Sequence, residues 1–185
     1  METWMWVALI AGIIVVAAVI WFLVRQSKTR ALQRDFGPEY DRTMERAGDR
    51  SMAESDLRER RERVEALDVR PLSRSDHDRF VTEWTKVQAA FVDAPAEAVT
   101  DADELIQQVM AARGYPVQDF DRRAADVSVE HPEVVENYRS AHSIALKEAR
   151  EDTDANTEAL RKAMVYYRSL FDELLVVENG VDRRN

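Results

Sequence analysis

An uncharged apolar run near the N-terminus constrains this chain more than any other feature. The run extends from Trp4 to Val24 (WMWVALIAGIIVVAAVIWFLV) and contains 21 residues without a charged side chain. As a helix rising about 1.5 Å per residue it measures roughly 31 Å, which matches the hydrocarbon core of a bilayer. Aromatic residues lie near both ends of the run, Trp4 and Trp6 at one end and Trp21 and Phe22 at the other. Aromatic rings at such positions favour the headgroup level of a membrane. The run therefore predicts a transmembrane helix.

The charges that flank the run predict its orientation. Arg25, Lys28, Arg30 and Arg34 follow it before the first acid, Asp35, whereas no lysine or arginine precedes it. Basic residues favour the cytoplasmic side of a membrane helix. We therefore expect a single-pass protein of the cytoplasmic (inner) membrane, with the N-terminus outside and the C-terminal domain in the cytoplasm. A cleaved signal peptide would need a basic stretch before the apolar run, and the sequence has none.

The stretch RDFGPEYDRT interrupts the chain soon after the membrane. Residues 25–35 contain no helix breaker and are expected to extend the membrane helix, until Gly37 ends it and Pro38 begins the next helix. Glu39 would then lie in the first turn of that helix, near the positive end of its dipole. We interpret the segment from Phe36 to Tyr40 as a hinge. A second interpretation is that Phe36 and Tyr40 dock onto the domain or a partner, with Gly-Pro shaping the turn.

The next segment, residues 38–67, predicts one charged helix with two apolar stripes. The stripes are offset from each other near Gly48, and Arg60 occupies a position where a heptad pattern needs an apolar residue. A solvated stalk, a short imperfect coiled coil and a helix packed along its own bundle all remain open. An extended linker, residues 68–72, is expected to follow.

Residues 73–177 predict a small all-α bundle of about four helices. Ser75 or Asp76 could cap the first helix, Gly114 is typical of a helix end, Pro132 can open a helix and the last one starts around Asn156. The chain thus divides into a tail and membrane helix (1–24), an arm with hinge, stalk and linker (25–72), the bundle (73–177) and a disordered tail (178–185).

Charge and composition exclude several classes of partner and chemistry. The net charge is −9, and residues 73–185 carry 14 basic against 23 acidic side chains, so nucleic acid is not expected to bind the bundle. The chain has no cysteine, which excludes thiol chemistry and disulfides. We expect a protein partner at the membrane.

Catalytic signatures are missing from the sequence. It contains no glycine-rich phosphate loop, no H-E-x-x-H, no G-x-S-x-G and no calcium-binding loop. His77, His131 and His142 are too far apart in sequence for two of them to lie one turn apart on one helix. Acid pairs such as Asp101 with Asp103 are expected on a solvated face. We therefore predict no enzyme activity, no metal and no cofactor.

Two groups of residues are nevertheless candidates for binding. His142 lies on the same helix face as Tyr138, and we interpret it as a core histidine that donates to a carbonyl or to Tyr138, with a ligand-binding or proton-handling role as the alternative. A pocket near these two residues and Trp84 could hold a small molecule. The loop at Tyr115 and Pro116 could serve as a docking surface, although Tyr115 is expected to pack under its own turn.

Four segments of the chain resemble a family of small bacterial proteins of uncharacterised function. The segments are FGPEYDRT (36–43), LDVRPLS (67–73), RGYPVQDF (113–120) and HPEVVENYRSAH (131–142). The resemblance covers nearly the whole chain. It implies a single N-terminal membrane helix followed by a helical region, and it brings no catalytic residues.

Together these observations lead to one main hypothesis and three alternatives. The main hypothesis is a non-catalytic, membrane-tethered helical module that presents an acidic bundle to a protein partner at the cytoplasmic membrane. The first alternative is a ligand-responsive sensory domain with a pocket near Trp84, Tyr138 and His142. The second alternative is an enzyme that uses dispersed acids or His142. The third is an outward-facing domain.

Overall fold

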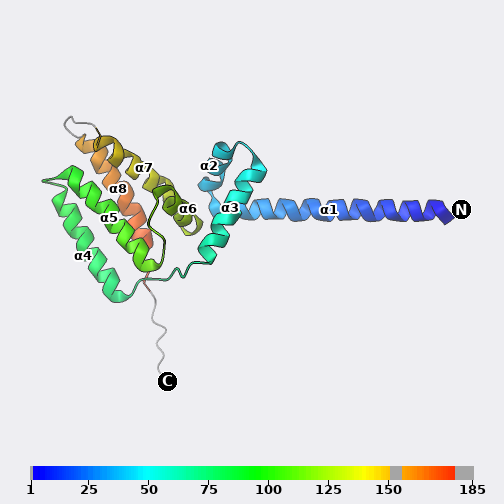
Figure 1. Cartoon of the computed structure of the whole chain (residues 1–185), viewed down its shortest axis with the longest axis horizontal. Helices are drawn as coiled ribbons and strands as arrows, with labels where there is room; N and C mark the ends of the chain where they lie inside the picture. Colours follow the sequence, from blue (N-terminus) through cyan, green and yellow to red (C-terminus); the bar gives the residue numbers. More distant parts are fainter. Residues whose placement is uncertain (1, 151–155, 178–185) are drawn as a thin grey trace, which may run out of the picture. The chain divides into compact units, whose positions relative to one another are not determined.

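The computed structural model describes residues 2–150 and 156–177, and within them the chain is all-α, as predicted. The predicted disordered tail, residues 178–185, lies outside the described residues. Figure 1 labels the eight helices of the described part. Their bounds are α1 Glu2–Phe36, α2 Pro38–Ala47, α3 Arg50–Glu65, α4 Arg74–Ala90, α5 Pro95–Arg113, α6 Phe120–Glu130, α7 Val135–Glu148 and α8 Thr157–Leu174.

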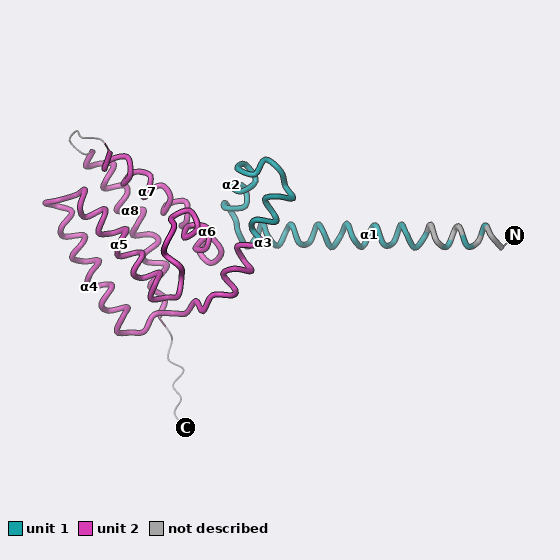
Figure 2. Tube along the Cα trace, in the orientation of Figure 1, with its two compact units in different colours: residues 1–57 teal, residues 58–185 magenta. Residues whose placement is uncertain are grey.

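The chain forms two compact units, residues 1–57 and residues 58–185, which Figure 2 distinguishes by colour. The division falls within α3, whereas the sequence suggested that the bundle begins at residue 73. The end of α3 and the segment after it therefore belong to the bundle.

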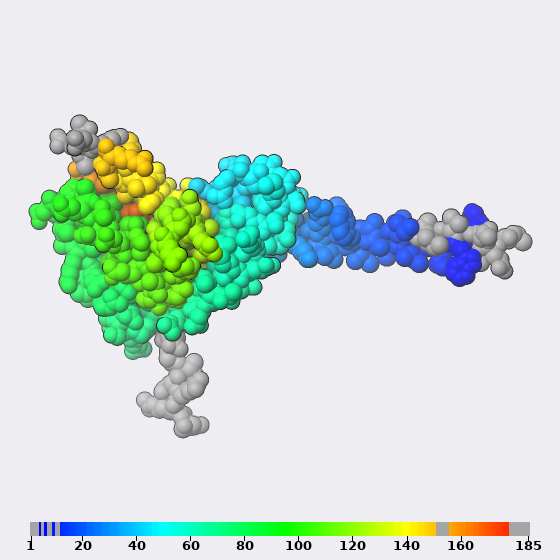
Figure 3. All heavy atoms as spheres, viewed as in Figure 1, coloured from blue at the N-terminus to red at the C-terminus, as the bar shows by residue number. Residues whose placement is uncertain are grey.

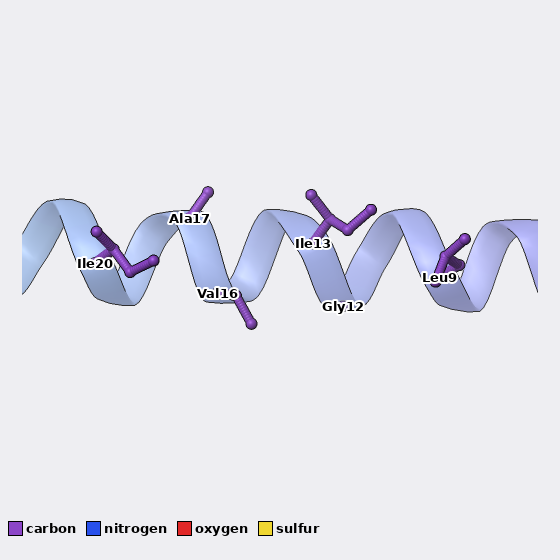
Figure 4. Close-up of a pocket in the computed structure, with 6 residues that line it drawn as sticks. All are labelled: Leu9, Gly12, Ile13, Val16, Ala17 and Ile20. Atoms are coloured by element: carbon purple, nitrogen blue, oxygen red, sulfur yellow. The ribbon is translucent and has the colours of Figure 1, made fainter.

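Helix α1 of the first unit is long enough and apolar enough to cross a membrane. Among the described residues, the apolar side chains of this helix over residues 13–24 are exposed (Figure 3). The side of the helix around Gly12 is a shallow hollow lined only by apolar residues (Figure 4). As predicted, α1 continues without a break through the basic residues and ends at Phe36.

Glycines set the helix ends of the first unit. Gly37 has a positive φ of 44°, and α2 begins at Pro38, so the predicted Gly-Pro break is confirmed. The prediction of one helix over residues 38–67 is wrong. Gly48 adopts the left-handed conformation with φ 66° and closes α2, and the Asp49 carboxylate accepts a hydrogen bond from the Met52 amide at 2.9 Å at the start of α3.

Burial along α3 changes the interpretation of the stalk. Ala53 and Leu57 are 0% exposed and Val64 is 5% exposed, so the second apolar stripe is covered by this chain itself. Arg60, at the position that breaks the heptad pattern, is also buried. A solvated stalk is therefore excluded for α3, while pairing of α3 with another chain stays a prediction.

In the second unit, α5 and α8 form the centre of the bundle. Helix α4 packs on α5, α7 packs on α5 and α8, and α6 packs on α7. The largest fully buried side chains at this centre include Phe80, Ile106, Tyr138, Tyr167 and Phe171. The apolar stripes of four long helices meet here, which is why the amphipathic pattern predicted a bundle.

Capping residues fix where the bundle helices begin. Ser73, rather than Ser75 or Asp76, caps α4, because its hydroxyl oxygen accepts a hydrogen bond from the Asp76 amide at 3.0 Å. Asn156 caps α8, as predicted, and Gly114, with φ 100°, ends α5. Pro132 lies in a turn before α7, which begins at Val135 and thus later than expected.

The predicted linker, residues 68–72, is an integral part of the bundle. The Arg70 amide donates to the Arg113 carbonyl at 2.9 Å, and the Leu72 amide donates to the Val176 carbonyl at 2.9 Å. Leu72 is 1% exposed and belongs to the core. The segment therefore holds the ends of α5 and α8 together.

Candidate functional site

The predicted hinge residues are mostly interior residues of the chain. Phe36 is 1% exposed, Glu39 is 2% exposed and Tyr40 is 4% exposed, whereas Pro38 is exposed. The Tyr40 amide donates to the Gly37 carbonyl at 3.1 Å, which closes the turn. A partner could reach Phe36 or Tyr40 only if these side chains left their packed positions, so docking onto a partner loses its support, while docking onto the domain stays a prediction.

Tyr40 contributes to a buried polar cluster around Glu54 that the sequence did not reveal. The Glu54 Oε1 atom accepts hydrogen bonds from Thr29 Oγ1 at 2.8 Å, from Tyr40 Oη at 3.2 Å and from Arg50 Nε at 2.8 Å. Thr29 and Glu54 are 4% and 9% exposed. One carboxylate oxygen thus connects α1, α2 and α3 just beyond the apolar run.

The charge state of this cluster follows from its hydrogen bonds. Burial by itself raises the pKa of Glu54, but the hydrogen bonds from Arg50 and Thr29 outweigh burial, so the pKa lies below its ordinary value. Burial and the neighbouring Glu54 charge raise the pKa of Tyr40. At neutral pH the cluster therefore pairs a carboxylate with a neutral tyrosine and a guanidinium. Only the Arg50 and Glu54 pair, four residues apart, was detectable in the sequence.

In the second unit, Trp84 fills the core instead of lining an open pocket. Its ring stacks on Phe171 with the centroids 4.5 Å apart, and the side chain is 4% exposed. The indole Nε1 atom is buried without a hydrogen-bond partner among the described residues. The predicted apolar face of α4 is confirmed for Phe80 and Trp84, which are both buried.

Tyr138 and His142 lie close together, but through different contacts from those expected. The Tyr138 hydroxyl accepts a hydrogen bond from Arg123 Nε at 2.7 Å, and the Tyr138 side chain is fully buried. The His142 ring is half-buried and stacks on Phe120, with centroids 3.6 Å apart. Burial is the main cause that lowers the pKa of His142. The expected contact in which His142 donates to Tyr138 is replaced by this stacking.

Arg123 and Asp103 complete this interior group and were not among the predicted site residues. Arg123 is 4% exposed and also donates through Nη1 to the Val117 carbonyl at 2.8 Å. Burial and then the neighbouring Asp103 charge raise the pKa of both Tyr138 and Tyr167. The Tyr167 hydroxyl and Asp103 Oδ1 are both buried, and a hydrogen bond between Tyr167 and Asp103 is a further cause that raises the pKa of Tyr167. Charged residues do not contribute to apolar periodicity, so no pattern in the sequence pointed to either position.

The Tyr115 and Pro116 loop is closed by a second polar group. Tyr115 is 3% exposed and its hydroxyl donates to Glu130 Oε2 at 2.5 Å, so Tyr115 packs inside its own turn, as expected. Arg113 contacts the same Glu130 oxygen at 3.3 Å and His131 Nε2 at 3.2 Å. Pro116 is half-buried. The loop therefore offers little surface for docking.

An acidic groove is the surface feature of the second unit with the clearest chemistry. It lies between α4 and α5 and encloses about 250 Å³. Its floor contains Val87 and Leu105, and its rim carries the carboxylates of Glu83, Asp101 and Glu104. The remaining lining residues are Lys86 and Gln108. The groove therefore combines negative charge with a small apolar area.

Within residues 2–150 and 156–177, no group of histidine and acidic side chains is arranged to hold a metal ion. Comparison with family models, with curated proteins and with solved structures found no match to this chain.

Proposed function

We propose that this protein is a membrane-tethered, non-catalytic interaction module that presents its acidic bundle to a basic protein partner on the cytoplasmic side. The apolar length of α1 and the four basic residues that follow it support the tether and its orientation. One observation supports an interaction module over a ligand-binding domain. The aromatic side chains that could have lined a ligand pocket pack against each other and fill the bundle interior.

The acidic groove between α4 and α5 is the surface on which we place the partner. Two of its rim acids, Asp101 and Glu104, are exposed and follow one another closely on α5. Opposite charges accelerate association and select partners, while the apolar floor provides area to bury. A membrane anchor raises the local concentration of the groove near other membrane-bound proteins.

A photocrosslinking experiment in intact cells tests this proposal. A photoreactive amino acid at Gln108, on the groove lining, should give a covalent adduct with a discrete partner. Replacing Asp101→Lys and Glu104→Lys together should reduce the adduct about tenfold, because each charge reversal replaces an attraction by a repulsion. The matched control reverses two exposed acids outside the groove, Glu133 and Glu158, and should leave the adduct unchanged.

Two outcomes would contradict the proposal. An adduct of equal yield with the groove charges reversed would exclude the groove as the binding surface. High alkaline phosphatase activity from a C-terminal fusion would place the bundle outside the cytoplasm, since that enzyme requires an oxidising compartment.

A second candidate function, a ligand-responsive domain, rests on an unpartnered polar atom in the interior. Trp84 Nε1 is buried without a hydrogen bond to described residues. Buried polar groups normally have partners, and a small polar molecule could supply one. A ligand of this kind would raise the melting temperature of the wild-type bundle but not that of a Trp84→Phe variant.

A further inference from the structure

A cavity lies on the first unit where the apolar part of α1 ends. It encloses about 400 Å³, within the range of small-ligand sites, and residues of α1 and α3 line it. Its lining combines two aromatic rings, two guanidinium groups and two uncharged polar side chains. These residues are Trp21, Phe22, Arg25, Gln26, Thr29 and Arg50.

The two arginines come from positions 25 residues apart in the chain. Arg25 follows the apolar run directly, and its guanidinium lies 5.3 Å from the centroid of the Trp21 ring. Arg50 comes from the start of α3, and its Nε donates to Glu54 Oε1 at 2.8 Å. That bond uses one of the five N–H donors of the guanidinium, and a hydrogen bond with Tyr40 uses a second one. The Glu54 cluster therefore orients Arg50 while its terminal nitrogens still carry donors for an anion.

The position of the cavity along α1 sets its depth in a membrane. Trp21 and Arg25 are four residues apart, so about 6 Å of helix separates them. Tryptophan at the end of an apolar span lies at the headgroup level, and an arginine one turn further lies among the phosphates. The hollow around Gly12, by contrast, lies within the apolar run and has only hydrocarbon side chains, so it offers acyl chains contact without charge.

We infer that the cavity between Trp21, Arg25 and Arg50 binds the phosphate headgroup of an anionic phospholipid. This inference rests on the proposed membrane anchoring. Arg25 and Arg50 pair with the phosphate, because guanidinium groups form strong charge-assisted hydrogen bonds with phosphate oxygens. Trp21 and Phe22 lie against the glycerol and the first part of the acyl chains. Gln26 provides a polar contact for a hydroxylated headgroup, and the bound lipid thereby joins α3 to the membrane surface.

Native mass spectrometry of the full-length protein tests this site. The protein in detergent is mixed with equal amounts of phosphatidylglycerol and phosphatidylcholine, and the lipids it retains are counted. We expect a preference for phosphatidylglycerol that Arg25→Gln and Arg50→Gln each reduce about fivefold, as expected for one basic residue at a membrane surface. Arg30→Gln is the matched control, because it removes the same charge from an exposed neighbouring position outside the cavity.

Several results would overturn the inference. Equal retention of the two lipids would exclude an anionic headgroup site, and an equal loss in Arg30→Gln would show a diffuse basic surface instead of a built cavity. Displacement of phosphatidylglycerol by excess inorganic phosphate would indicate a site for free phosphate, since a lipid held also by Trp21 and Phe22 should stay bound. The Arg25 variant leaves the Glu54 cluster intact, so its loss of lipid cannot be attributed to a disturbed α3.

Carbonate extraction of membranes separates failure of this site from failure of the proposed function. A protein that resists extraction yet shows no preference for phosphatidylglycerol contradicts the lipid site alone. A protein that carbonate releases contradicts the membrane anchor and the lipid site with it.

Discussion

Glu54 illustrates how a single residue can determine local structure in this protein. Its Oε1 atom accepts hydrogen bonds from Thr29, Tyr40 and Arg50, so the carboxylate stays charged although it is buried. A carboxylate whose pKa is lowered in the folded state stabilises the fold above its unfolded pKa, and this stability is lost as the pH falls through the folded pKa. Acid should therefore loosen the junction of α1, α2 and α3.

At the residue scale, His142 provides a prediction for the bundle. Burial lowers its pKa below about 6.5, the usual value for histidine, and the charges of Asp103, Arg123 and Asp121 act on it as well. The unfolded chain then binds a proton more readily than the folded one, so stability falls as the pH decreases below about 6.5. We expect His142→Gln to make this decrease shallower in urea denaturation measured between about pH 7 and pH 5.

The wild type, measured over the same pH range, is the reference for this experiment. Part of the decrease should remain in His142→Gln, because burial also lowers the pKa of His131. Identical pH profiles for the wild type and His142→Gln would show that His142 does not couple to folding.

At the element scale, glycines with positive φ decide where helices end. Gly37, Gly48 and Gly114 have φ values of 44°, 66° and 100°, and each ends a helix. Side chains with a β-carbon rarely adopt this conformation. The surroundings of Gly48 and Gly114 differ, however. A β-carbon at Gly48 would meet nothing within 4 Å, whereas one at Gly114 would lie 2.5 Å from the Asp68 carbonyl oxygen.

This difference predicts unequal effects of the same substitution. Gly114→Ala should cost about 2 kcal/mol or more, because the strain of the left-handed conformation adds to a clash with backbone that cannot yield cheaply. The clash should break the nearby bond from the Arg70 amide to the Arg113 carbonyl, so hydrogen exchange at Arg70 should accelerate. Gly48→Ala, the control, should leave exchange at Arg70 unchanged. Unaltered exchange in Gly114→Ala would refute the tight packing at this position.

At the scale of the whole molecule, the bundle begins earlier in the chain than its first predicted helix. Arg63 on α3 contacts Asp126 Oδ1 at 2.8 Å, and the Asp126 side chain is fully buried. Leu72 lies in the core, where its amide bonds to Val176. Residues 58–72 therefore contribute a buried ion pair and apolar area to the second unit.

A comparison of two fragments tests this boundary. The free energy of unfolding of residues 73–177 alone should be at least about 4 kcal/mol lower than that of residues 58–177. The shorter fragment lacks Arg63, so Asp126 stays buried without its ion-pair partner, and it lacks Leu72, so the core surface that Leu72 covers becomes exposed. Urea denaturation followed by circular dichroism measures the difference. Arg63→Ala in the longer fragment serves as the control and should account for part of the loss. Equal stability of the two fragments would return the boundary to residue 73.

The sequence by itself determined the all-α class, the apolar helix, the Gly-Pro break and the helix ends at Gly114 and Asn156. These features depend on hydrophobic periodicity and on the conformations that glycine and proline favour, which act over a few residues. The break at Gly48 has the same local signal, a glycine followed by a capping aspartate, so the end of α2 was also predictable from the sequence.

Only the tertiary structure decided which polar side chains meet. Thr29 and Arg50 converge on Glu54, Arg63 pairs with Asp126 and Arg123 bonds to Tyr138, and the sequence contains no pattern that links the members of the last two pairs. From the sequence alone an arginine is expected to be solvent-exposed. It becomes buried only when a distant helix brings an acid or a hydroxyl close to it. The packing of helix against helix therefore created both the Glu54 cluster and the cavity beside Arg50.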